Sequence, residues 1–158
     1  MAFAEAGMDW YRSSNQNIYQ TAGLDIWPRQ VAKHAFNIML NTDSPAKAEK
    51  SLLYWRSTDT LFEKIGFDPP KGWAGSLVAA ITETFPELKN VFYSKPANRF
   101  MNIEGSICMA AIEWGMKADI PILTIHDSFI CPQSHADQMR KEIIRQFEEK
   151  VGVVCMVE

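Results

Sequence analysis

Apolar positions recur at helical spacing over the first two thirds of the chain. Val31, Ala35 and Met39 lie four residues apart, and this spacing predicts an amphipathic helix over about 25–41. Before it, residues 1–24 are expected to form a short helical turn and a loop. After it, a helix is expected to start at Ser44-Pro45, in a segment that ends near Gly66 and is followed by a loop over 68–72. Two further helices are expected over 73–85 and 98–117.

The pattern changes to short apolar runs in the last third of the chain. Residues 120–125 are almost all apolar, residues 126–128 are polar, and residues 129–131 are again mostly apolar, which predicts two buried strands joined by a tight turn. Ser134 begins a sequence of the capping-box type before another helical pattern, and 151–157 is typical of a closing strand. The order α-β-β-α-β predicts an α/β fold of the α+β kind.

The composition is that of an ordinary globular protein with one core. Of the 158 residues, 47% are hydrophobic and 22% are charged. No apolar run of about 18 residues and no basic leader before an apolar segment occurs, so we expect no contact with a membrane and a cytoplasmic location. The cysteines, Cys108, Cys131 and Cys155, match no metal motif by their spacing, and we expect reduced, mostly buried thiols.

The net charge of −3 is a weak argument against nucleic-acid binding, because phosphate contacts usually come from a surplus of lysine and arginine. Basic residues do recur at Arg29, Lys33, Lys95 and Arg99, although an evenly solvated surface has the same appearance. The polar face of the helix expected over 25–41 gathers Arg29, Gln30, Lys33, His34, Asn37 and Asn41.

Asp127 stands at the expected tip of the hairpin. A carboxylate crowded between two strands is costly unless a cation or a donor meets it. Hard cations such as Mg²⁺ take carboxylate, water and phosphate oxygens as ligands, so Asp127 is a candidate ligand in a phosphoryl-transfer site. The simpler alternative is that Asp127 and Ser128 are there as turn formers.

The segment Ile125-His126-Asp127-Ser128 resembles motif C of family A (DNA polymerase I-like) polymerases and of the single-subunit phage RNA polymerases. The resemblance implies that Asp127 binds the catalytic Mg²⁺ and that His126 lies near the primer end. It further implies an antiparallel palm-like sheet within residues 98–158 and a helical fingers-like segment within residues 1–97.

Arg99, Asn102 and Glu104-Gly105 resemble the residues that open the palm helix of the same family. The resemblance implies contact with the nucleic acid at these positions. Glutamate replaces the family's usual glutamine at position 104, which weakens the expectation of a template contact there.

The segment from Arg29 to Asn41 resembles motif B, the fingers helix of the family. Residues four apart share one helix face, so Arg29 and Lys33 have the spacing to meet the phosphates of one nucleoside triphosphate. The resemblance extends the nucleotide-binding face to Asn37 and Asn41. Asn41-Thr42 stands where the family has tyrosine and glycine, and the spacing between the two motifs is short for the family. An Arg-x-x-x-Lys pair on a solvated helix face is the simpler alternative.

No segment resembles motif A, which supplies the second metal-binding carboxylate of the family. Glu5, Asp9 and Asp25 are candidates, although ordinary surface or capping roles suit each of them. We therefore expect a truncated, split or degenerate polymerase, with a longer chain or a second polypeptide completing the site and with DNA primer-template and nucleoside triphosphates as partners.

Two other functions remain open from the sequence. One is a module that keeps the fold and binds nucleic acid or a replication protein without catalysis. The other is a metal-dependent hydrolase built on His126 and Asp127, although only His34 and His135 are available as further histidines and such sites usually gather several ligands.

Overall fold

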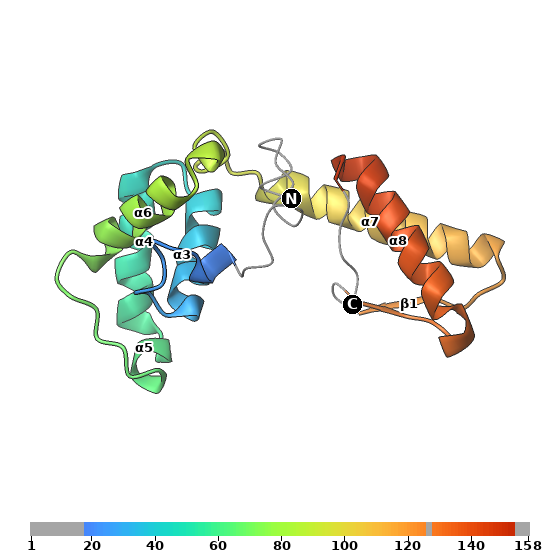
Figure 1. Cartoon of the computed structure of the whole chain (residues 1–158), viewed down its shortest axis with the longest axis horizontal. Coiled ribbons are helices and arrows are strands. Elements are labelled where there is room, and N and C mark those ends of the chain that lie inside the picture. The colour runs from blue at the N-terminus through green and yellow to red at the C-terminus, as the bar shows by residue number, and fades with distance from the viewer. Residues whose placement is uncertain (1–17, 126–127, 154–158) are drawn as a thin grey trace. The chain divides into compact units, whose positions relative to one another are not determined.

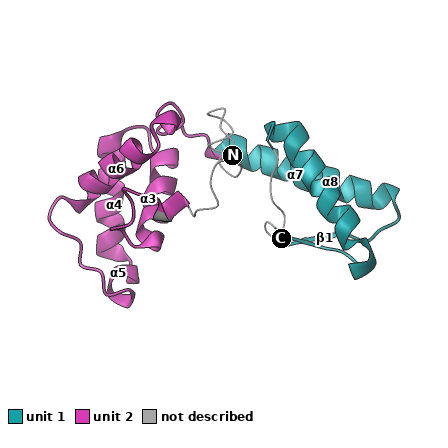
Figure 2. Cartoon of the chain, viewed as in Figure 1, with its two compact units in different colours: residues 1, 3–14, 98–158 teal, residues 2, 15–97 magenta. Residues whose placement is uncertain are grey.

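The computed structural model describes residues 18–125 and 128–153. The chain divides into two compact units, and the division falls between Ala97 and Asn98 (Figure 2). The described part of one unit is 18–97, and that of the other is 98–125 and 128–153. The described residues are mostly helical, with one small antiparallel sheet, so the fold belongs to the general α+β class.

The unit of residues 18–97 is built from helices. Their bounds are η1 Ile18–Gln20, α3 Arg29–Asn41, α4 Pro45–Thr58, α5 Leu61–Lys64, α6 Trp73–Thr84 and η2 Pro86–Leu88 (Figure 1). Helices α3, α4 and α6 pack against one another in pairs. The hydroxyl of Ser44 accepts a hydrogen bond from the backbone N–H of Lys47 at 3.4 Å, and this cap explains why α4 begins directly after it.

Aromatic side chains dominate the core of this unit. Phe36 of α3 meets Phe85 and Phe92 edge to face, with ring centroids 5.9 Å and 5.2 Å apart. Trp27 and Trp73 are also buried, whereas Trp55 is half-buried. The side chains that are fully buried include Leu24, Val31, Met39, Leu52, Phe62, Leu77, Ile81, Phe85 and Leu88.

The unit that begins at residue 98 combines two helices with a hairpin. Its elements are α7 Ala97–Lys117, β1 Leu123–Ile125, β2 Ser128–Ile130, η3 Gln133–His135 and α8 Ala136–Val151. Strand β1 pairs with β2 in antiparallel register, with Leu123 opposite Ile130 and Ile125 opposite Ser128.

The expectation that these strands are buried is wrong. Leu123, Ile125 and Ile130 are 65%, 53% and 49% exposed, and the register places them on one face of the hairpin. Phe129, on the opposite face, is half-buried. The sheet has two strands in the part of the chain that the structure describes, which leaves nothing there to cover the apolar face.

Several element ends differ from the sequence expectations. Helix α3 begins at Arg29 instead of residue 25, because Leu24 and Trp27 are tied into a turn by backbone hydrogen bonds. Ser134 does not cap α8: its hydroxyl lies 3.0 Å from Nδ1 of His135, and residues 133–135 form a 3₁₀ turn.

The strand expected over 151–157 is wrong at its start. Val151 ends α8, and Gly152 closes the helix with a φ of 80°, a left-handed conformation that favours glycine. Residues 154–157 lie outside the described part of the chain.

Cys108 and Cys131 are half-buried free thiols, more exposed than the sequence predicted, and Cys155 lies outside the described residues. None of the helices in the described ranges combines the length and apolar character needed to cross a bilayer.

Candidate functional site

Helix α3 presents a polar stripe made of Arg29, Lys33, Asn37 and Asn41, all of them exposed. Successive members are four residues apart, so each is displaced by about 40° around the helix and about 6 Å along it from the one before. The opposite face is buried in the core of the unit. The stripe therefore has two cations in its first half and two carboxamides in its second.

Arg29 is positioned by an aromatic side chain. Its guanidinium carbon lies 5.9 Å from the centroid of the Tyr19 ring, and Tyr19 in turn meets Phe36 edge to face at 5.8 Å. Burial raises the pKa of the Tyr19 hydroxyl, and the nearby Arg29 opposes that shift. Lys33 makes no ion pair with any residue that the structure describes, so its ammonium group is available to an anion.

The two asparagines are joined at the end of the helix. Nδ2 of Asn41 donates a hydrogen bond of 2.8 Å to the backbone oxygen of Asn37. This bond holds the Asn41 side chain against the last turn of α3, so Asn41 has a structural role as well as its place in the stripe.

His34 belongs to the same polar face in the sequence but has a different environment in the structure. Its ring stacks on Trp55 of α4, with centroids 3.8 Å apart. Desolvation lowers the pKa of His34, and the charge of Asp59 acts in the opposite direction. His34 thus joins two helices and is not part of the open stripe.

The hairpin carries the proposed metal ligand at a position that lies outside the described residues. His126 and Asp127 are the two residues between Ile125 and Ser128, which pair with each other across the hairpin. Among residues 18–125 and 128–153, no three histidine, cysteine, aspartate or glutamate side chains come together as a metal site.

Arg99, Asn102 and Glu104 are all exposed on α7. Arg99 and Asn102 are three residues apart and share one face, whereas Glu104 lies about 160° around the helix from Asn102. The helix therefore brings the first two together and separates Glu104 from them. The guanidinium of Arg99 lies 6.0 Å from the ring centroid of Phe100.

The charge balance differs between the two units. Residues 18–97 contain nine lysines and arginines and eight aspartates and glutamates, whereas residues 98–158 contain six and nine. The acidic excess of the whole chain thus comes mainly from the second segment, and the unit that carries the α3 stripe is close to neutral. The net charge of −3 is a weaker argument against anion binding at α3 than it is for the chain as a whole.

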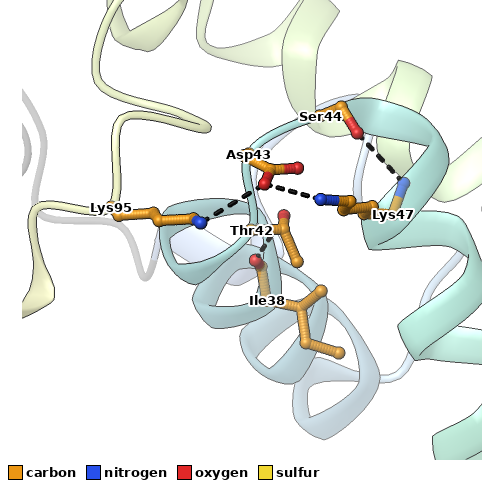
Figure 3. Close-up of polar contacts among 6 residues, drawn as sticks. All are labelled: Ile38, Thr42, Asp43, Ser44, Lys47 and Lys95. Atoms are coloured by element: carbon orange, nitrogen blue, oxygen red, sulfur yellow. Dashed lines mark hydrogen bonds and ion pairs between the residues drawn. The ribbon is translucent and has the colours of Figure 1, made fainter.

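A second cluster of charge, which the sequence analysis did not find, follows the end of α3. Asp43 accepts hydrogen bonds from the ammonium groups of Lys47, at 2.7 Å, and Lys95, at 3.3 Å (Figure 3). These two bonds hold the pKa of Asp43 below its usual value, and the bond from Lys47 has the larger effect. The Lys47 contact has helical spacing and was visible in the sequence, but Lys95 is 52 residues away from Asp43 and carries no local signal.

Comparison with family models, with curated proteins and with solved structures finds no match to this chain.

Proposed function

We propose that this chain is the fingers-and-palm piece of a template-directed nucleotidyltransferase of the family A DNA polymerase kind. The observation that carries the proposal is the exposed stripe on α3, in which Arg29 and Lys33 lie one helical turn apart. Two cations at this spacing meet adjacent phosphates of one triphosphate. Residues 1–97 then act as the fingers-like part, and residues 98–158 as the palm-like part.

In this mechanism the chain's own residues mainly bind and orient the reactants. Arg29 and Lys33 hold the β- and γ-phosphates and stabilise the charge that develops on the departing pyrophosphate. Asn37 and Asn41 continue the nucleotide-binding face toward the sugar. Arg99 and Asn102 hold the nucleic-acid backbone, and Glu104 contributes less because it lies on another side of α7.

The reaction centre of the proposal is His126 and Asp127. Asp127 is the residue that would hold Mg²⁺, which supplies Lewis-acid activation of the primer hydroxyl and neutralises phosphate charge. His126 orients the primer end. Two-metal transfer needs carboxylates on both ions, so the proposal requires a second carboxylate, from Glu5, Asp9 or Asp25, from a longer form of the chain or from a second polypeptide.

The test of the stripe is direct binding of a nucleoside triphosphate. We expect the chain to bind dATP with Mg²⁺ in a calorimetric titration and Arg29→Ala or Lys33→Ala each to weaken binding about tenfold, because a charge-assisted hydrogen bond contributes about 1.5–3 kcal/mol. Lys50→Ala, which removes an exposed lysine of α4, is the matched control and leaves binding unchanged. Equal affinity in all four proteins contradicts the assignment of Arg29 and Lys33.

The test of catalysis is primer extension with Mg²⁺ and all four nucleotides. The chain is compared with a form extended upstream through an aspartate-bearing segment, and each is also made as Asp127→Ala. Extension by the longer form, lost in Asp127→Ala, supports the polymerase. Extension that survives Asp127→Ala contradicts the role of this carboxylate.

A non-catalytic module derived from a polymerase is the second candidate, and the exposed apolar side chains of residues 98–153 favour it. Leu123, Ile125 and Ile130 form one apolar face of the hairpin. Met101 and Met116 of α7 are 66% and 77% exposed. Apolar exposure of this extent is typical of surfaces that bind another protein. This candidate predicts that nucleic-acid or partner binding is unaffected by Asp127→Ala.

A further inference from the structure

The segment that leads from the first unit into α7 is held against the end of α3. The backbone N–H of Tyr93 donates a hydrogen bond of 2.9 Å to the oxygen of Met39, one of the last carbonyl groups of the helix. Two residues further on, the ammonium group of Lys95 contacts Asp43 at 3.3 Å. All four residues belong to the unit of residues 18–97. After Lys95, Pro96 is the one residue left before α7 begins at Ala97.

The backbone of this segment is strained. Tyr93 has a φ of 64° and Lys95 a φ of 55°. Positive φ is unfavourable for residues other than glycine, most of all for bulky ones. Lys95 also precedes Pro96, whose ring favours extended backbone at the residue before it. Such conformations persist where surrounding contacts impose them.

Asp43, which accepts the Lys95 contact, is held in place by the residues on either side of it. Asp43 lies between Thr42, whose hydroxyl donates to the Ile38 oxygen at 2.9 Å, and Ser44, which caps α4 (Figure 3). The end of α3 and the start of α4 therefore hold the carboxylate in place. Lys47 occupies the same oxygen of Asp43 as Lys95 does, Oδ2, but from within the first turn of α4.

We propose that Asp43 and Lys95 form an ionic latch that keeps the connection between the two units bound to the end of α3. While the ion pair is formed, Tyr93 and Lys95 keep their positive φ values and the Tyr93 N–H stays bonded to Met39. When it opens, the strain at Tyr93 and Lys95 favours release of the Tyr93 N–H from the Met39 oxygen. The inference does not depend on the polymerase-like function.

The latch responds to salt because both partners are partly exposed. The Lys95 and Asp43 side chains are 57% and 38% exposed, so dissolved ions screen their attraction. The expected effect of ionic strength is therefore a shift in the population of the open connection, with the fold of the unit unchanged.

Amide hydrogen exchange at Tyr93, measured by NMR on the full chain, tests the proposal. The variant is Lys95→Met, and the matched control is Lys47→Met, which removes the other lysine on the same carboxylate oxygen without touching the connection. Exchange at Tyr93 is divided by exchange at the Phe36 amide, which reports on the core. We expect this ratio to rise severalfold in Lys95→Met and to stay within about twofold of wild type in Lys47→Met.

A salt series gives the second measurement. Between about 0.05 M and about 1 M salt, the ratio is expected to rise in the wild type and to stay constant in Lys95→Met. A ratio in Lys95→Met equal to that of wild type, or an equal rise in Lys47→Met, overturns the latch. The latch is also overturned if the exchange ratio of Lys95→Met rises with salt as much as that of the wild type, because the salt then screens another pair of charges.

Discussion

The imidazole of His34 stacks on the indole of Trp55, with ring centroids 3.8 Å apart and 25° between the ring planes. The indole N–H donates a hydrogen bond of 3.0 Å to Asp59, and Phe62 meets the indole ring at 4.8 Å. The contact joins α3 to α4 beside the polar stripe. It also places a titratable ring where protonation is unfavourable.

We expect the stability of the protein to depend on pH through His34. Desolvation lowers the pKa of His34 in the folded protein, so between this pKa and the unfolded value of about 6.5 the unfolded chain binds more protons. The stabilising contribution is complete above about pH 6.5 and is lost as the pH falls through the folded pKa. Urea unfolding at a series of pH values measures the free energy of unfolding.

The variant His34→Phe keeps an aromatic ring on Trp55 and removes the titration. The difference in free energy of unfolding between wild type and His34→Phe should therefore shift against the wild type as the pH falls below about 6.5. The rest of the chain is identical in the two proteins, so its contribution cancels in the difference. A difference that is independent of pH contradicts the assignment.

Ser44→Ala removes the cap of α4. Because the Ser44 hydroxyl accepts from the Lys47 N–H, we expect a loss of about 1 kcal/mol in the free energy of unfolding. Ser57→Ala is the matched control, since Ser57 is exposed at the other end of the helix and bonds back to the Tyr54 oxygen. Chemical denaturation should show little change for the control, and equal losses would argue against the cap.

Two glycines of α7 should respond oppositely to alanine. A Cβ at Gly115 would clash with the Ile122 side chain and lie 2.9 Å from the Ile120 oxygen, so Gly115→Ala should destabilise by about 1–3 kcal/mol. At Gly105 nothing lies within 4 Å of the new Cβ, and Gly105→Ala should stabilise the helix by up to about 1 kcal/mol. Thermal unfolding followed by circular dichroism tests both, and a stabilising Gly115→Ala would contradict the packing.

Helix α8 buries a polar group on its inner face. Glu142 is 9% exposed and accepts hydrogen bonds from Arg145, at 2.7 Å, and from Nε2 of Gln146, at 2.8 Å. Glu142→Ala leaves the buried amide of Gln146 without its acceptor, so we expect a loss of about 1–3 kcal/mol.

Glu149→Ala is the control for this prediction. Glu149 is the other partner of Arg145, and its side chain is 62% exposed. Its removal should lower the free energy of unfolding, measured in urea, by less than about 0.5 kcal/mol. An equal loss of unfolding free energy in the two variants would show that the buried position of Glu142 adds nothing to stability.

Periodicity was a good guide to the helices because their inner faces are apolar. The buried positions of α3, Val31, Ala35 and Met39 among them, have helical spacing in the sequence, and Ser44-Pro45 marks the start of α4 by local chemistry. The same reasoning failed at Ser134, where the hydroxyl lies beside the His135 ring instead of capping the helix.

The candidate site was predictable to a similar degree. The stripe from Arg29 to Asn41 follows from four-residue spacing once the helix is known, and its exposure agrees with the structure. His34 has the same polar character but contacts Trp55, a residue 21 positions away whose approach no local pattern indicates. The roles of His126 and Asp127 stay predictions.

The sequence by itself determined most of the helices, because helical periodicity and end caps act between residues that are near in the chain. It indicated a hairpin but not its register, because Ser128, expected in the turn, lies in β2 opposite Ile125. The tertiary structure decided which polar groups from distant parts of the chain contact one another. Asp43 and Lys95 form an ion pair and Tyr93 bonds to Met39 only because the packing of α3, α4 and α6 returns the chain to the end of α3. Contacts between distant residues depend on how the whole unit closes its core, which local sequence does not specify.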